Sequence, residues 1–129
     1  MSVAIEKFGK DHWSTLAYIE TRCVNHKGIP NREHMRCDLD RHPGLVNLAS
    51  NGTKKYPTLL KGGEELPDHD DWDCVDDLIA VGFLEWGGTG INPVFKMTPD
   101  GLDVAARLRK HKGNGGRFGN FEYQVNNAL

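Results

Sequence analysis

Apolar residues recur at helical spacing in two long segments of the chain. In residues 11–26 the stripe includes Trp13, and in residues 68–81 it includes Trp72. Each segment begins with an aspartate, which is a favourable N-cap residue, and further aspartates in the second segment favour the helix dipole. We therefore expect a helix in each segment, with a short additional helix over residues 31–37.

Polar and apolar residues alternate in two places where β-hairpins are expected. Residues 56–60 and 64–66 flank a Lys-Gly-Gly turn, although Pro57 restricts the first strand to an edge position. Residues 83–86 and 94–97 flank the flexible sequence Gly-Gly-Thr-Gly. The sequence thus predicts one hairpin before the second long helix and another hairpin after it.

A final helix should follow the second hairpin. Thr98 is a suitable N-cap and Pro99 suits the first helical position. Its apolar surface is expected to consist of Leu102, Ala105, Ala106 and Leu108. Gly113 should end this helix. The remaining residues, 113–129, are rich in Gly and Asn and are expected to form a tail that is ordered only if its aromatic residues dock.

The order helix, hairpin, helix resembles the C-terminal part of winged helix-turn-helix domains. There, DDLIAVGFLEW would end the third helix and begin the wing, GGTGINP would be the wing, and VFKMTPDGLDVAARLRKH would be the second strand with the closing helix. The resemblance implies an α+β fold, a winged helix-turn-helix with an extra N-terminal helical region and a small β-hairpin. It also implies a single domain over residues 1–112, followed by the tail 113–129.

The winged-helix resemblance says less about function, because winged helices bind DNA, RNA and proteins alike. The whole sequence is also similar to small uncharacterised proteins of bacterial and phage genomes, which suggests a phage or mobile-element origin. We expect a regulatory or accessory protein that acts through nucleic-acid or protein contacts and that can form a homodimer.

Length and composition favour one small domain. With 129 residues, of which 38% are hydrophobic, the chain can bury one modest core. No run approaches the roughly 18 apolar residues of a membrane span, and residues 1–10 lack the apolar stretch of a secretory signal. The three cysteines show no dense spacing, which favours free thiols. We therefore expect a cytoplasmic protein without membrane contacts.

Net charge offers no overall attraction to nucleic acid, since the formal charge is −2 and the pI is near 6.3. Any such binding must come from a local basic patch. The candidate residues are Arg32, Arg36, Arg41, Lys54, Lys55, Arg107, Arg109, Lys110, Lys112 and Arg117. These residues would give salt-sensitive binding that is largely independent of nucleotide sequence. The alternative is that they are ordinary solvated charges.

The second long helix is strongly acidic. It carries Asp70, Asp71, Asp73, Asp76 and Asp77. In a DNA-binding winged helix this helix would enter the major groove, where carboxylates facing phosphates would oppose binding. One alternative is a surface that docks a basic protein partner and mimics DNA, as in a phage-type inhibitor or adaptor. The other is a solvated outer face whose acids favour the helix start.

A mirrored pair of ligand-type dipeptides suggests a zinc site. Cys23 and His26 lie three residues apart, as do His34 and Cys37, so each pair can share a helical face. The four could close a tetrahedral Cys2His2 site that staples a small domain. The alternative is that Cys23 belongs to the core and the histidines lie on the surface.

No local pattern favours catalysis. A Ser/His/Asp or Cys/His arrangement has no local support, and the Gly-Gly-Thr-Gly sequence lacks the Lys-Ser/Thr ending of a phosphate loop. His69 precedes several aspartates, but consecutive residues on a helix point in different directions, so no convergent set is predicted. We therefore expect a protein that is not an enzyme.

Overall fold

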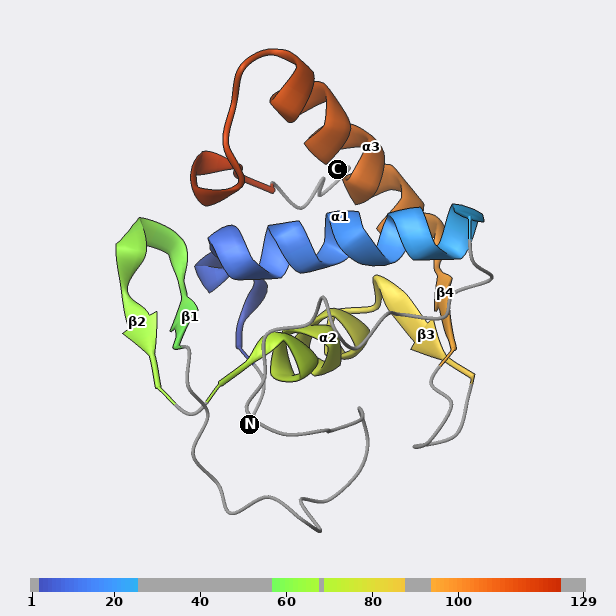
Figure 1. Ribbon diagram of the computed structural model, residues 1–129, viewed down its shortest axis with the longest axis horizontal. Coiled ribbons are helices and arrows are strands. Elements are labelled where there is room, and N and C mark those ends of the chain that lie inside the picture. The colour runs from blue at the N-terminus through green and yellow to red at the C-terminus, as the bar shows by residue number, and fades with distance from the viewer. Residues whose placement is uncertain (1–2, 26–56, 68, 88–93, 124–129) are drawn as a thin grey trace, which may run out of the picture.

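The computed structural model describes residues 3–25, 57–67, 69–87 and 94–123 (Figure 1). Within these residues the fold is α+β, with three α-helices and two antiparallel sheets of two strands each. The helices are α1 (Lys10–Asn25), α2 (Asp71–Ala80) and α3 (Pro99–Gly113), and the strands are β1 (Thr58–Leu59), β2 (Glu65–Leu66), β3 (Leu84–Trp86) and β4 (Phe95–Met97). Short 3-10 turns lie at η1 (Ile5–Lys7), η3 (Lys61–Gly63) and η4 (Phe118–Asn120). The helix expected over residues 31–37 lies outside the described residues.

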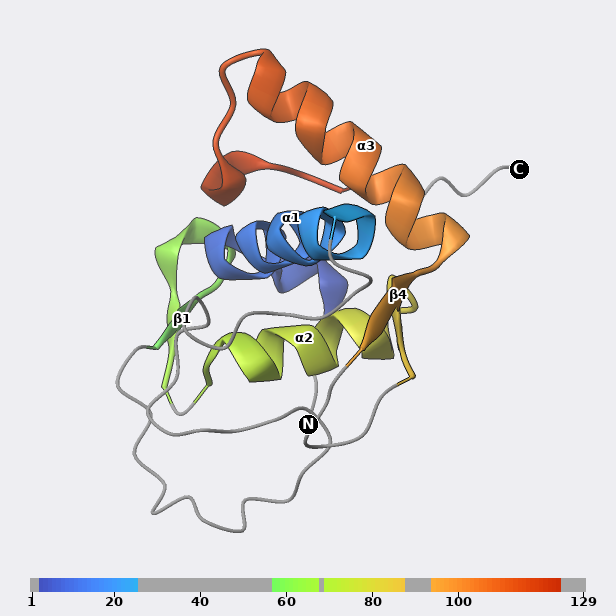
Figure 2. The same cartoon turned by 45° about the vertical axis from the view of Figure 1, so that its right-hand side comes forward.

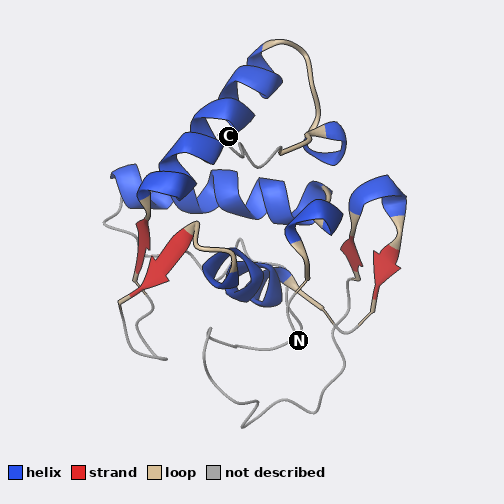
Figure 3. Cartoon of the chain, turned by 180° about the vertical axis from the view of Figure 1, so that it is seen from behind, coloured by secondary structure: helices blue, strands red, loops and turns tan. Residues whose placement is uncertain are grey.

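Helix α1 is the centre of the molecule. It packs against α2 on one side and α3 on the other, as two views agree (Figures 1 and 2). The β1–β2 hairpin lies at one end of the molecule and the β3–β4 hairpin at the other (Figure 3). Trp13, Leu16 and Ile19 of α1 are buried in one core with Trp72 and Leu78 of α2. The apolar stripe of α1 therefore faces inward over most of the helix, as its spacing predicts, whereas Val24 near the end of the helix is 74% exposed.

Both hairpins are confirmed, with shorter strands than the sequence pattern indicates. Thr58 pairs with Leu66 in the first hairpin, and Leu84 pairs with Met97 in the second. The first hairpin approaches the start of α1 closely at Gly9, where a Cβ atom would lie 2.4 Å from the carbonyl oxygen of Leu59. A glycine at this position is what allows the two segments to meet.

Helix α2 begins two residues after the position expected from the sequence. Its N-cap is Asp70, whose Oδ1 accepts a hydrogen bond from the backbone N–H of Asp73 at 3.1 Å. The Asp73 carboxylate in turn accepts a hydrogen bond from the backbone N–H of Asp70 at 2.9 Å. This reciprocal capping box fixes the helix start, so the expectation that Asp68 caps the helix is wrong.

Helix α3 begins at Pro99, is capped by Thr98 as predicted, and extends to Gly113. Its buried face, however, consists of Gly101, Val104, Ala105 and Leu108, whereas Ala106 is exposed and Leu102 is 52% exposed. The physical reason is Gly101, which packs so closely on the residue before β3 that a Cβ atom would lie 2.0 Å from the carbonyl oxygen of Phe83. Since successive helical residues are about 100° apart, turning Gly101 inward turns Leu102 out.

The expected boundary of the domain at residue 112 is not where the packed structure ends. Phe121 is buried, and its ring meets that of Trp13 edge-on with centroids 4.9 Å apart. Phe118 and Tyr123 are partly buried against the same core. The aromatic residues of the expected tail therefore dock on α1 as far as Tyr123. Among the described residues, no helix has the length and apolar character needed to cross a bilayer.

Candidate functional site

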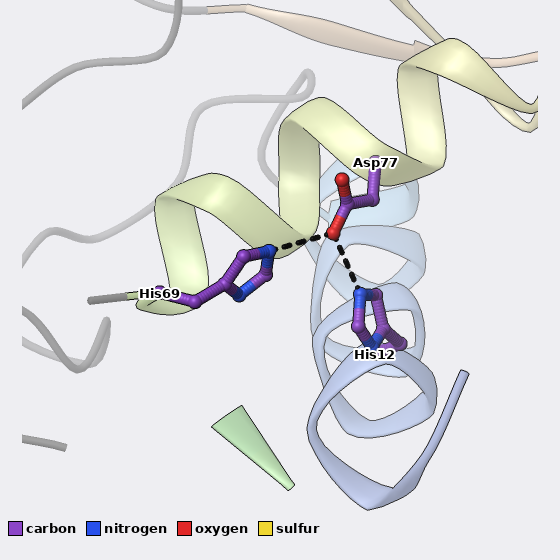
Figure 4. A group of neighbouring side chains, drawn as sticks. All are labelled: His12, His69 and Asp77. Atoms are coloured by element: carbon purple, nitrogen blue, oxygen red, sulfur yellow. Dashed lines mark hydrogen bonds and ion pairs between the residues drawn. The ribbon is translucent and has the colours of Figure 1, made fainter. Parts of the chain in front are cut away.

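Two histidines and an aspartate meet in the interior between α1 and α2 (Figure 4). Nε2 of His12 and Nε2 of His69 each lie 2.8 Å from the same Oδ2 atom of Asp77. The three residues are 0%, 7% and 3% exposed respectively. We call these three residues the His–Asp–His cluster.

Local structure positions each member of the His–Asp–His cluster. His12 lies one turn before Leu16 on the buried stripe of α1, and its ring stacks on Phe8 with centroids 4.2 Å apart. His69 immediately precedes the capping residue of α2, and Asp77 lies on the inner face of that helix. The sequence signal for His12 was its place in an apolar stripe, but this signal alone does not reveal a partner.

Burial and hydrogen bonding act in opposite directions on Asp77. Burial alone would raise the pKa of the Asp77 carboxyl group, but hydrogen bonds from His12, His69 and the backbone N–H of Val3 lower it further than burial raises it. The Val3 contact is made to the second oxygen, Oδ1, at 3.0 Å. The net effect is a pKa below the ordinary value, so the buried group is a carboxylate held by three partners.

A threonine of the first hairpin extends the cluster. The Thr58 hydroxyl is buried, lies 2.6 Å from Nδ1 of His69 and donates to the carbonyl oxygen of His69 at 2.8 Å. Cys74 lies beside this pair, and burial is the main cause that raises the pKa of its thiol well above the ordinary value. The cluster therefore ties β1, α1 and α2 together in one polar network.

The acidic surface expected on α2 does not exist as predicted. Asp70, Asp71 and Asp77 are buried, and Asp73 is half-buried, so that Asp76 alone among the five predicted partner-binding aspartates is exposed. Capping uses Asp70 and Asp73, and the histidines use Asp77. Most of these carboxylates therefore face backbone donors and imidazoles, which removes the geometric basis for a DNA-mimicking face.

Half of the predicted nucleic-acid-binding residues lie outside the described residues, namely Arg32, Arg36, Arg41, Lys54 and Lys55. The remaining five lie on the second half of α3 and just after it. Two of them have acidic partners: Arg107 pairs with Asp103 at 3.1 Å, and Arg109 pairs with Glu20 of α1. Lys110, Lys112 and Arg117 are exposed.

Lys112 and Arg117 border a cavity of about 520 Å³ between the start of α1, the end of α3 and η4. Lys10 completes its positive lining, and Phe118, Gly119 and Asn120 form the rest. We call it the basic pocket. Among the described residues that line it, three are cationic and none is acidic. The ammonium group of Lys112 lies 4.4 Å from the centre of the Phe118 ring, which orients the lysine side chain.

The wall of the basic pocket is held in shape by the end of α3. Nε2 of His111 lies 2.7 Å from Oδ1 of Asn120, which also accepts a hydrogen bond from the backbone N–H of Arg117 at 2.9 Å. Because this oxygen can only accept, the histidine nitrogen donates to it. Lys10 and Phe118 were not predicted as site residues, since Lys10 is distant in sequence from the α3 basic residues.

The predicted zinc site of Cys23, His26, His34 and Cys37 stays a prediction. His26, His34 and Cys37 lie outside the described residues. Cys23 is half-buried, and its Sγ atom donates a hydrogen bond to the carbonyl oxygen of Phe95 at 3.3 Å. Burial, the largest cause, raises the pKa of this thiol. A raised thiol pKa disfavours the thiolate, which is the form of cysteine that binds metals.

Comparisons with known proteins return no relative for this chain. No family model, no curated protein and no solved structure matches it. The basis for a functional inference is therefore the chemistry of the basic pocket and of the His–Asp–His cluster.

Proposed function

We propose that this protein is a non-enzymatic, winged-helix-type regulatory or accessory protein that binds the phosphate backbone of nucleic acid at the basic pocket. The single observation that carries this proposal is the composition of that pocket. Lys10, Lys112 and Arg117 converge on it from three different elements, without an acidic residue among its described lining. A concave site of this charge attracts anions, and phosphates supply most of the binding free energy of proteins that bind nucleic acid without sequence preference.

Phosphate is favoured over base edges as the group that is recognised. Base edges are read by a helix placed in a groove, and α2, which precedes the second hairpin, exposes Asp76 while burying most of its other polar side chains. The exposed cations that were predicted to bind nucleic acid and that the structure describes lie instead in the second half of α3 and on the adjoining turn. Contacts of this kind position a nucleic acid without reading its sequence.

A wider surface adjoins the basic pocket. A second, more apolar hollow of about 340 Å³ is lined by Ala17, Leu108 and Phe118 among others, and Lys112 borders both hollows. A nucleotide has both a charged and an apolar part, and neighbouring charged and apolar hollows fit that combination. This arrangement favours a single strand, whose bases can leave the stack, over a rigid duplex.

Fluorescence anisotropy with labelled single-stranded and duplex oligonucleotides of random sequence tests the proposal. At low salt we expect binding in the micromolar range or tighter, and the double variant Lys112→Gln/Arg117→Gln should weaken it by about tenfold or more because two phosphate contacts are lost. Lys96→Gln is the matched control, since Lys96 is exposed on β4, away from the pocket.

Two results would contradict the nucleic-acid proposal. One is no anisotropy change with wild-type protein at micromolar concentration in low salt. The other is an equal loss of affinity in Lys96→Gln, which would mean that the overall charge and not the basic pocket is responsible. Circular dichroism of each variant verifies that the fold is retained.

A further inference from the structure

The convergence of two imidazoles on one carboxylate oxygen carries an inference that is independent of nucleic-acid binding. We propose that His12, His69 and Asp77 form a binding site for a divalent first-row transition ion, with zinc as the best fit. The ligand atoms would be Nε2 of each histidine and Oδ2 of the aspartate. These three atoms lie within 4.8 Å of one another.

The hydrogen bonds around His69 determine which of its ring nitrogens carries a proton. The carbonyl oxygen of His69 can only accept, so the single hydroxyl proton of Thr58 is donated to it at 2.8 Å. The Nδ1 atom of His69, 2.6 Å from the same hydroxyl oxygen, must then be the donor. Its other nitrogen, Nε2, therefore faces the Asp77 carboxylate either with a second proton or with a lone pair. A lone pair on Nε2 would repel the negatively charged Asp77 oxygen 2.8 Å away. In that case a cation must lie between the two atoms.

The hydrogen bond between Thr58 and Nδ1 of His69 is of the kind that supports metal-bound histidines. A histidine that ligates a metal through one nitrogen generally donates its other N–H to a carbonyl, a carboxylate or a similar acceptor, which fixes the ring and its tautomer. Thr58 fills that role for His69.

The ligand set also supports the proposal. Two neutral imidazoles and one carboxylate suit zinc, which takes about 2.0–2.2 Å to nitrogen and oxygen and commonly keeps a fourth position for water. At those bond lengths, tetrahedral ligand atoms lie about 3.3 Å apart. The two present distances of 2.8 Å would need to widen by about half an ångström, and the distance between the two histidine nitrogens, which is at most 4.8 Å, would need to reach the same value. The fourth ligand would be water, because the backbone of Val3 already binds the other oxygen of Asp77.

The support for the two histidines is unequal. Nδ1 of His12 is buried and has no hydrogen-bond partner in the described part of the chain. Once His12 binds a metal, that nitrogen carries a proton with no acceptor, which lowers the affinity. We therefore expect binding that is weaker than that of a structural zinc finger.

Cobalt substitution tests the site directly. The full chain, freed of metal with a chelator and dialysed, is titrated with Co²⁺ and then with Zn²⁺. We expect visible d–d bands that saturate at one equivalent and lack thiolate-to-cobalt charge transfer, followed by bleaching with zinc. His69→Gln should abolish the bands, and Thr58→Val should weaken binding about 10–100-fold because the support of His69 is lost. Asp76→Asn is the control, because this exposed carboxylate neighbours Asp77 in the sequence without being a proposed ligand and should leave the bands unchanged.

The following results would contradict the proposed metal site. Absence of d–d bands in the wild-type titration, or zinc uptake below one equivalent by elemental analysis, means that the cluster holds protons only. Thiolate charge transfer in wild type, or bands that persist in a folded His69→Gln protein, places the ion at cysteine ligands instead. If His69→Gln does not fold, the wild-type spectrum and Thr58→Val decide the question. None of these readings depends on whether nucleic acid binds at the basic pocket.

Discussion

At the scale of single residues, the aspartates of α2 show that the direction of a charged side chain depends on available donors. Asp77 lies on a helix that also carries exposed Asp76, one position earlier. It turns inward because two imidazole nitrogens and one backbone N–H are available there. A buried carboxylate is stable only when its oxygens have such partners. A count of acidic residues therefore cannot say which of them reach solvent.

Asp77→Asn should destabilise the metal-free protein. Asparagine has nearly the same shape, but its amide nitrogen is a donor and cannot accept from the histidines or from Val3. We expect the free energy of unfolding to fall by about 2–4 kcal/mol, as when one partner of a buried network is removed. Asp76→Asn is the control and should change it by less than about 0.5 kcal/mol. Urea denaturation in chelator measures both, and equal effects of the two variants would refute the role of Asp77.

The difference in the free energy of unfolding between wild type and Asp77→Asn should depend on pH. The folded pKa of Asp77 lies below its unfolded value, so its contribution is complete above the unfolded pKa of about 3.9 and is lost as the pH falls through the folded pKa. The stability difference between wild type and Asp77→Asn should thus shrink as the pH falls below about pH 4. A difference that stays constant throughout the acid range would show that the carboxylate charge is unimportant.

At the scale of elements, α3 shows how one glycine sets the face of a helix. Thr98 caps the helix by accepting from the backbone N–H of Gly101 at 2.9 Å. Gly101 then lies against the carbonyl of Phe83, where no side chain fits. The rotation of the whole helix follows from this contact, and it places Val104 and Leu108 in the core while Leu102 faces outward.

Gly101→Ala therefore tests the packing of α3 on β3. Alanine favours helix formation by about 1 kcal/mol over glycine, but here its Cβ would meet the Phe83 carbonyl, and overpacking costs about 1–3 kcal/mol. We expect a lower melting temperature in thermal denaturation. Gly113→Ala provides the contrast, because nothing lies within 4 Å of a Cβ atom at that position, and it should leave stability unchanged or raise it. A Gly101→Ala protein as stable as Gly113→Ala would refute the close contact.

At the scale of the whole molecule, the features that could be predicted from the sequence are those with local causes. The Thr98 cap, the two hairpins and the inward face of α1 each depend on residues near one another in the chain. The His–Asp–His cluster could not be predicted, because His12 and Asp77 are 65 residues apart and meet only when α1 packs on α2. The same holds for Lys10 in the basic pocket, where an N-terminal residue joins the end of α3.

The docking of residues 118–123 on the core also could not be predicted from the neighbouring sequence. Gly-rich sequence around residue 115 favours a flexible tail, yet Phe121 fills a place beside Trp13 in the core. Tertiary burial of one aromatic ring outweighs the local preference for disorder. This docking also brings Arg117 and Phe118 to the start of α1, so that the basic pocket exists only in the complete fold.

The salt dependence of oligonucleotide binding is the most direct test of the central claim that the basic pocket contacts phosphates. For a single strand, the logarithm of the binding constant should fall linearly with the logarithm of salt concentration, with a slope of about −0.7 for each phosphate contact. Lys112→Gln/Arg117→Gln should make that slope shallower by about 1.4, whereas Lys96→Gln should leave it unchanged. A slope near zero for wild type, or the same slope in the double variant, would contradict the account.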